Sequence, residues 1–249
     1  MLPLGFASGL PLALTAGTLQ AWLTVAGLDL RTIGIFSLAG LPYTLKFLWS
    51  PVIDRFAPPW LGRRRGWMLA SQLALILGIA AMAFSGPGGG TDPRIMLLGG
   101  LAIAVAFLSA SQDIAYDAYR ADLLRPEERG PGAGVSVTGY RIAMLTAGAI
   151  ALILSERIGW RETYLLMAAL MTVGVVSTYV SPEPAAPPSV PKTLSEAIVA
   201  PLRNFFDRPA AVALLFLIIL YKIGDAFAGS LSTWISDFGT IGSLISTFQ

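Results

Sequence analysis

The stretch "IMLLGGLAIAVAFLSASQDIAYDAYRADLL" (Ile95–Leu124) joins a long apolar run to a segment with three carboxylates. The apolar part is long enough to cross a hydrocarbon core, which needs roughly 20 residues of helix. A charge near the middle of a bilayer costs at least about 2.5–3.5 kcal/mol, so a carboxylate at that depth is a candidate functional group. The stretch therefore predicts a membrane-spanning helix whose acids have a function.

The whole chain has the composition of a membrane protein. Its 249 residues are 55% apolar and 13% charged, with a mean hydropathy of +0.68. A soluble domain carries about twice that charged fraction. The first apolar stretch has neither the positive region nor the cleavage site of a secretory signal. We expect an all-α polytopic membrane protein with seven spans: Leu2–Ala26, Ile33–Ile53, Trp67–Ser85, Ile95–Ala118, Gly134–Leu154, Thr163–Val180 and Ala210–Ile235.

Two residue types that often carry chemistry are missing. The chain contains no cysteine and no histidine, which excludes disulfides, thiolate metal sites and histidine proton shuttles. A transferred proton would therefore ride on a carboxylate, because burial raises the pKa of such a group towards neutrality. The net charge of +2 is too small to suggest nucleic acid, and we expect no metal and no cofactor.

Cations cluster on alternate sides of the predicted spans. Because cytoplasmic loops carry an excess of Lys and Arg, the richer set of loops is expected inside, and the N-terminus with it. That set holds ten cations, namely Arg55, Arg63, Arg64, Arg65, Arg120, Arg125, Arg129, Lys192, Arg203 and Arg208. The other set holds four, namely Arg31, Arg94, Arg157 and Arg161.

The spans divide the chain into four parts. Residues 1–181 hold six spans, residues 182–208 form a Pro-rich cytoplasmic linker, residues 209–235 form the seventh span, and residues 236–249 form a divergent tail. The first half of the linker is semi-rigid because of its prolines. Its second half repeats apolar residues at helical spacing, which predicts an amphipathic helix on the inner membrane surface; these residues are Leu194, Ile198, Leu202 and Phe205.

Two loops carry acid–arginine patterns. "SPVIDRFAPPWLGRRRGW" (Ser50–Trp67) resembles the major facilitator signature of Asp-Arg followed by Gly-Arg-Arg, although Ser50 replaces a Gly and "APPWL" is inserted before Gly62. "RADLLRPEERGPGAG" (Arg120–Gly134) resembles the Asp, Pro, Arg-Gly pattern of the same superfamily. An acid that accepts from arginines on a facing helix end can hold one conformation closed. We expect a cytoplasmic gate of Asp54, Arg55, Arg63, Arg64, Asp122 and Arg129; anchoring of Arg63 to Arg65 on anionic headgroups is the alternative.

Longer phrases narrow the resemblance. "GFASGLPLALTAGTLQAWLT" (Gly5–Thr24), "SASQDIAYDAY" (Ser109–Tyr119), "VPKTLSEAIVAPLRNFF" (Val190–Phe206) and "LYKIGDAFAGSLST" (Leu220–Thr233) are similar to the AmpG-type muropeptide permeases. The resemblance implies a major facilitator N-terminal six-helix bundle followed by the first helix of a second bundle. It also implies proton-coupled import across a Gram-negative inner membrane. The implied cargo is an anionic glycopeptide of cell-wall recycling, N-acetylglucosaminyl-1,6-anhydro-N-acetylmuramyl peptide, whose import in relatives also feeds β-lactamase induction.

The spans themselves contain six charges: Lys46, Asp113, Asp117, Arg141, Lys222 and Asp225. Charges inside a membrane pair as a rule, so structural ion pairs alone would account for them. At 100° per residue, Asp113 and Asp117 share a helix face with Arg120, whereas Asp122 lies about 180° from Asp113 and about 13 Å away along the axis. Asp113 is therefore the first candidate for the proton carrier and Asp225 the second, while Asp117 is expected to pair locally with Arg120.

An anionic sugar peptide would be bound by cations and aromatic rings. Candidates are Lys46, Arg141 and Lys222 for its carboxylates, and Tyr43, Tyr116, Tyr140 and Trp22 for its sugar faces. Aromatic residues in spans also act as packing or interface anchors. Small residues at four-residue spacing in the fifth span, Gly139, Ala143 and Ala147, predict close helix packing. Gly5, Gly9 and Pro11 predict either packing or a bend.

A two-bundle carrier needs a second bundle of about six spans, and this sequence stops after its seventh. From Trp234 onward both the apolar run and the resemblance end. From the sequence we expect a fragment that does not transport by itself.

Other functions fit parts of the pattern. A major facilitator carrier of another anionic solute, such as an acyl-coenzyme A or a sugar phosphate, would share the loop motifs. A seven-helix retinal photoreceptor would use Lys222 for the Schiff base and Asp113 as counter-ion, but such proteins place the N-terminus outside. A membrane hydrolase would have only an aspartyl pair, since Gly-x-Ser-x-Gly is absent, so we expect no enzyme.

Overall fold

The structure is a computed structural model that describes residues 1–56, 58–87, 94–184, 199, 202–224 and 227. It divides into two compact units, Met1–Leu194 and Ser195–Gln249. Every regular element among the described residues is helical. The predicted all-α class is confirmed.

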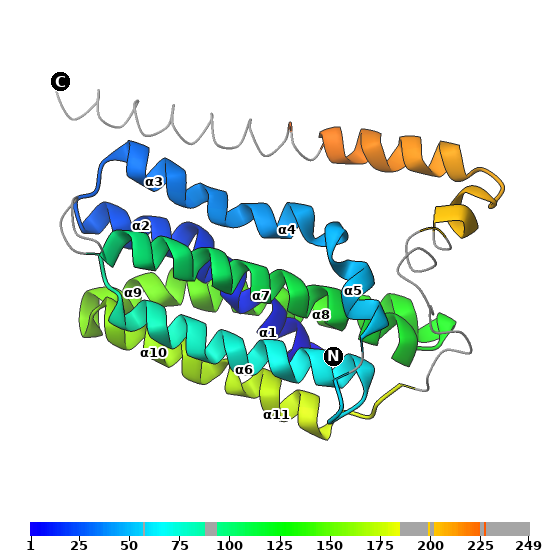
Figure 1. The fold of residues 1–249 in the computed structure, drawn as a ribbon, viewed down its shortest axis with the longest axis horizontal. Helices are drawn as coiled ribbons and strands as arrows, with labels where there is room; N and C mark the ends of the chain where they lie inside the picture. The colour runs from blue at the N-terminus through cyan, green and yellow to red at the C-terminus, as the bar shows by residue number, and fades with distance from the viewer. Residues whose placement is uncertain (57, 88–93, 185–198, 200–201, 225–226, 228–249) are drawn as a thin grey trace. The chain divides into compact units, whose positions relative to one another are not determined.

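The first unit is a bundle of long apolar helices that run up and down along a common direction (Figure 1). Five helical segments are long and apolar enough to cross a membrane: Leu2–Val25, Arg63–Phe84, Arg94–Leu123, Pro126–Ile158 and Trp160–Val180. These segments match five of the seven predicted spans. Four of them, all except Leu2–Val25, extend beyond the predicted apolar run at one end or both, because helices continue into the polar residues that flank a hydrocarbon core.

Two of these segments are single α-helices, α6 (Arg63–Phe84) and α7 (Arg94–Leu123). The first segment consists of α1 (Leu2–Ala13), the π-helical η1 (Leu14–Thr18) and α2 (Leu19–Val25). The fourth consists of η4 (Pro126–Glu128), α8 (Arg129–Leu145), the π-helical η5 (Thr146–Ile150) and α9 (Ala151–Ile158). The fifth consists of α10 (Trp160–Leu170) and α11 (Thr172–Val180).

The predicted second span, Ile33–Ile53, is not one continuous α-helix. The structure instead has short pieces in series: α3 (Leu30–Phe36), η2 (Ser37–Gly40), α4 (Leu41–Leu45), η3 (Lys46–Leu48) and α5 (Ser50–Arg55). Pro42 and Pro51 lie in the first turns of α4 and α5, where a missing N–H is tolerated but the preceding helix is interrupted. Lys46 therefore lies on a 3₁₀ turn between two such breaks.

In the second unit the structure describes an apolar helix, Ala211–Gly224, within the predicted seventh span. The rest of that span, including Asp225, lies outside the described residues. Of the predicted amphipathic helix, residues 202–206 are helical, and Leu194 and Ile198 lie outside the described part. The predicted tail, residues 236–249, lies outside it as well.

Close packing of α1 on α8 fixes the centre of the bundle. A Cβ on Gly5 would collide with the backbone carbonyl of Ser136, and one on Gly139 would collide with that of Leu2. These glycines allow the two backbones to approach to contact, as the packing prediction requires. The first span also bends, because the π-helical η1 follows Pro11 and Ala16 leaves helical geometry there.

Candidate functional site

The site begins with Asp113, in the middle of α7. Its Oδ1 accepts a hydrogen bond of 2.5 Å from the Ser8 hydroxyl on α1, and its Oδ2 lies 3.9 Å from the Lys46 ammonium. The Asp113 side chain is 14% exposed and that of Lys46 is 36% exposed. Three elements thus meet at one carboxylate, which joins the first, second and fourth predicted spans.

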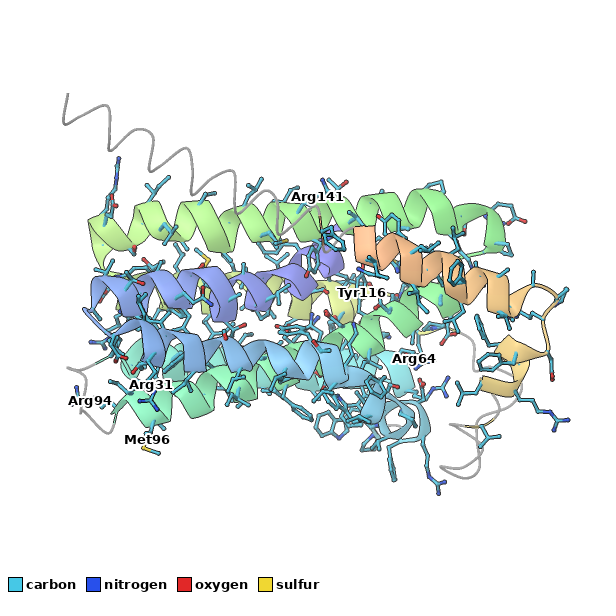
Figure 2. All side chains as sticks on the ribbon, turned by 90° about the horizontal axis from the view of Figure 1, so that it is seen from above. Arg31, Arg64, Arg94, Met96, Tyr116 and Arg141 are labelled. Carbon is cyan, nitrogen blue, oxygen red and sulfur yellow. The ribbon has the colours of Figure 1, made fainter. Side chains whose placement is uncertain are left out.

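A cavity of about 290 Å³ opens beside this carboxylate. It is lined by Ser8, Asp113, Tyr116, Asp117, Arg120, Ser136, Val137 and Tyr140, which come from α1, α7 and α8. The Tyr116 hydroxyl shares a 2.6 Å hydrogen bond with the Ser136 hydroxyl, so α7 is tied to α8 across the cavity. Figure 2 shows Tyr116 deep in the bundle. Seven of these eight residues carry a polar group that can face the cavity.

Asp117 makes the predicted local pair, because its Oδ1 lies 3.3 Å from Arg120 Nη2 one turn later on α7. That pair is more exposed than Asp113, with Asp117 at 56% and Arg120 at 28%. The local-pair prediction is confirmed.

The structure brings only some of the candidate binding residues to this cavity. Tyr116 and Tyr140 line it, and Lys46 reaches Asp113. Tyr43 is placed nearby by α4, next to Asp113 and Tyr140. Arg141 follows Tyr140 on α8 but lies on the exposed face of that helix (Figure 2). Lys222 belongs to the second unit.

Trp22 is not brought to the cavity. Its ring is 6% exposed and stacks on Trp160 at 5.6 Å, with Tyr164 at 4.9 Å. Its surroundings are those of a core residue, where aromatic rings pack on one another. In this structure Trp22 therefore joins α2 to α10.

A second ionic centre lies at one end of the bundle, around Arg64 (Figure 2). Arg64 Nη1 donates to Asp54 Oδ1 at 2.5 Å, and Arg64 Nε donates to Asp122 Oδ2 at 2.8 Å. One guanidinium thus bridges α5 and α7 from the first turn of α6. Arg63 adds a bond of 3.1 Å to the Asp54 carbonyl oxygen. Asp54, Arg63, Arg64 and Asp122 therefore lie together, as predicted for the gate.

The other two predicted gate residues lie apart from this guanidinium bridge. Arg129 donates to the carbonyl oxygens of Leu124 and Ala121 at 3.4 Å, so it caps the end of α7. Arg55 lies over the ring of Phe56 at 5.8 Å.

Sequence reasoning missed Glu183 and Arg65, which add a third connection at this end. Glu183 accepts from the backbone N–H groups of Arg64 and Arg65 at 3.0 and 3.2 Å. It therefore caps α6 from beyond the end of α11, where an anion stabilises a helix N-terminus. Arg65 in return donates to the carbonyl oxygens of Thr178 and Tyr179 at 2.9 and 2.6 Å. The signal that could have indicated this cap was the acid in "SPEP", directly after the sixth predicted span.

Gly62 makes this cap possible. It precedes α6 with φ of 88°, a conformation that glycine adopts without steric cost. A Cβ at this position would lie 2.6 Å from the Glu183 carboxylate. Another residue here would disturb both the turn and the cap.

A bundle of apolar helices with a cavity and ion pairs between its helices is typical of a multi-pass membrane transporter. The model of the Major Facilitator Superfamily matches residues 1–247. The chain belongs to the major facilitator superfamily.

Curated relatives point to one branch of that superfamily. The chain is 56% identical over 234 residues to the anhydromuropeptide permease of Escherichia coli K12, a match that covers 94% of this chain and 47% of that protein. The anhydromuropeptide permease of Escherichia coli O157:H7 matches equally. An uncharacterized protein of Haemophilus influenzae is 38% identical over 243 residues, or 94% of this chain and 56% of its own. The chain thus spans about half the length of the curated relatives it matches.

Proposed function

We propose that this chain supplies the N-terminal bundle of a proton-coupled importer of anhydromuropeptides in the inner membrane of a Gram-negative bacterium. The observation that carries the proposal is the 56% identity, over 94% of the chain, to the anhydromuropeptide permease of Escherichia coli. The Asp113–Lys46 pair beside a polar cavity agrees with it, because a charged pair inside a membrane bundle is a candidate for coupling.

Coupling would arise from two alternative ways of neutralising Asp113. In the structure its carboxylate faces the Lys46 ammonium at 3.9 Å, which is longer than a hydrogen-bonded ion pair. A proton bound to Asp113 would replace that ammonium, and Lys46 would become available to an acidic cargo. Release of the cargo and the proton would restore the pair. Asp225 stays the second candidate, in the second unit.

Cargo binding would use the polar wall of the cavity. Tyr116 and Tyr140 offer rings with polar tips, which suit sugar faces, and Lys46 offers a cation for the peptide carboxylates. Arg141, Lys222 and Tyr43 are further candidates for cargo binding, and Trp22 would act through packing.

The Arg64 centre would be the cytoplasmic gate. The excess of cations in the loops at this end favours an N-terminus in the cytoplasm. Figure 2 shows Arg64 at one end of the bundle, and Arg31 and Arg94 at the other. With Asp54, Asp122 and Arg64 joined, α5, α6 and α7 are held as one piece that could close against a second bundle.

The direct test is uptake of radiolabelled anhydromuropeptide by cells that lack their own importer and express a permease in which this chain supplies the N-terminal bundle. Accumulation against a gradient, driven by an inward pH gradient, is expected. Asp113→Asn should abolish that accumulation, and Asp117→Asn is the matched control because Asp117 is paired locally and more exposed. Uptake that ignores the pH gradient would overturn the proposed coupling, and no uptake of this cargo would overturn the proposed substrate.

A further inference from the structure

Three buried polar atoms, one on Tyr43 and two on residues within one turn of Asp113 on α7, have no hydrogen-bond partner among the described residues. They are the Tyr43 hydroxyl, the Ser109 hydroxyl and the Gln112 amide oxygen. The Ser109 and Gln112 side chains are both 1% exposed. Polar groups buried this deeply normally have partners in a folded protein, so a cluster of three indicates a site that binds something small and polar.

The cluster lies on the opposite side of Asp113 from the Arg64 end. Ser109 precedes Asp113 by one turn of α7, about 6 Å along the helix axis. The Tyr43 hydroxyl lies beside the side chains of Ser109 and Thr15 and close to Asp113. Thr15, which is 5% exposed, belongs to the π-helical η1, so the hydroxyls come from α4, α7 and η1.

Asp113 therefore lies between two different environments. Towards the Arg64 end it borders the 290 Å³ cavity that contains Asp117 and Arg120. Towards the other end it borders the compact hydroxyl cluster of Tyr43, Ser109 and Thr15. A carboxylate that exchanges protons with both sides of a membrane needs a polar connection in each direction, and the cavity supplies only one.

Building on the proposed function, we propose that Tyr43, Ser109, Thr15 and Gln112 form a buried water site that passes protons between Asp113 and the outer end of the bundle. The hydroxyls of Tyr43 and Ser109 suit this task because each can donate and accept a hydrogen bond at the same time. The Thr15 hydroxyl already donates to the Pro11 carbonyl oxygen at 3.0 Å, so it would act as an acceptor. A water molecule bridging them is nearly as favourable as a direct bond.

A metal cation fits this cluster less well. The carboxylate of Asp113 is already engaged by the Ser8 hydroxyl and faces the Lys46 ammonium at 3.9 Å. That ammonium would repel a second cation, whereas it leaves a neutral water undisturbed. The titratable groups that face Asp113 from the packed elements are Tyr43 on α4, Lys46 on η3, Tyr140 on α8, and Tyr116, Asp117 and Arg120 on α7.

The absence of cysteine from the sequence permits a direct test of hydration. Ser109→Cys places a single S–H group in the cluster, and its infrared band reports exchange with D₂O without a bulky probe. Ala110→Cys is the matched control, because Ala110 lies at the same depth on another face of α7 and is 0% exposed. Both variants are measured in the purified chain in lipid vesicles, after circular dichroism has verified their helicity.

We expect the Ser109→Cys thiol to exchange at least about tenfold faster than the Ala110→Cys thiol, because access limits the exchange of a buried thiol. Equal rates would overturn the water site. This result does not depend on transport, so it stands or falls separately from the proposed function.

A second measurement tests the role of the site in proton movement. Ser109→Ala removes a hydroxyl of the cluster at a residue that is not a cargo-binding candidate. We expect it to slow pH-driven uptake several-fold, while exchange of labelled for unlabelled cargo, which moves no net protons, keeps its rate. A loss of both activities would show a structural role, and a loss of neither would also overturn the proposal.

Discussion

The two ionic centres of the bundle are built in opposite ways. Asp113 and Lys46 are 3.9 Å apart inside the span, with one hydroxyl bond from Ser8 as support. Arg64 lies at a helix end and makes two bonds of 2.5 and 2.8 Å to Asp54 and Asp122. The Asp113–Lys46 pair is thus the more loosely held of the two, and the Arg64 centre, which we propose acts as a latch, is the more tightly held.

The helices that carry Lys46 and Arg64 also differ in how firmly they are held. Lys46 lies on the 3₁₀ turn η3, between short helices interrupted by prolines. Arg64 lies in the first turn of the 22-residue α6, whose N-terminus is capped by Glu183. Short 3₁₀ pieces have poorer hydrogen-bond geometry than a long α-helix, so the element that carries Lys46 is the easier one to move. This difference supports the proposal that the pair inside the span exchanges its partners during transport, whereas the ionic centre at the bundle end keeps its partners together.

The largest effect is expected from breaking the buried pair. Lys46→Gln removes the ammonium that replaces the proton on Asp113, so accumulation driven by a pH gradient should fall to background. Exchange of labelled for unlabelled cargo should persist at a raised cargo concentration, because it needs no change in the charge of Asp113 but loses one cation that binds the cargo. The control is Arg125→Gln, which breaks an exposed local pair with Glu128 and should change uptake by less than about twofold. Undiminished accumulation by Lys46→Gln would contradict the exchange of partners.

The second effect tests the latch. Arg64→Ala leaves two carboxylates without their guanidinium, and we expect the free energy of unfolding to fall by about 2–3 kcal/mol. Arg64→Lys should recover only part of the loss, because an ammonium cannot reproduce the planar fork that reaches two acids. Denaturant unfolding in detergent, followed by circular dichroism, measures both. Arg63→Ala, which removes a single bond to a backbone oxygen, should cost clearly less; an equal cost would argue against the bridge.

The sequence predicted this contrast only in part. Apolar length was enough for five spans, and helical spacing separated Asp113 from Asp122 correctly. The interruption of the second span depended on how Pro42 and Pro51 are placed within the run, which apolar length does not show. The contacts between Lys46 and Asp113, and between Glu183 and Arg64, are made by residues that lie far apart in the chain. Periodicity reports which face a residue takes on its own helix, and it carries no information on which helix packs against that face.

A smaller effect is expected from removing the Glu183 cap on α6, which tests whether this cap is part of the latch. Glu183→Gln keeps the shape of the side chain but loses the negative charge that faces the N-terminus of α6, so we expect a loss of about 1 kcal/mol in unfolding free energy. Glu127→Gln is the control, because Glu127 is exposed in η4 at the same end. Combining Glu183→Gln with Arg64→Ala should give a non-additive loss, since both act on the first turn of α6. Strict additivity would contradict one connected latch.

The smallest effect concerns a carboxylate that belongs to neither centre. Asp29 caps α3, where its side chain accepts from the Thr32 hydroxyl at 2.6 Å and from the Thr32 N–H at 3.1 Å. These bonds hold the pKa of Asp29 below its ordinary value of 3.8. Because the pKa is lowered by folding, the cap contributes fully above the unfolded pKa and is lost as pH falls through the folded one.

Hydrogen exchange at the Thr32 amide should therefore be constant from neutral pH down to about pH 4, after correction for intrinsic rates, and protection should fall below that. Asp29→Asn keeps a capping oxygen without a titrating group, so its protection should not change over the same range. If Thr32 protection still fell at low pH in Asp29→Asn, another acid would have to be responsible. If protection did not fall in either protein, capping by Asp29 would not limit the opening of α3. In that case the breaks within the Lys46 segment, and not its start, would set how easily that segment moves.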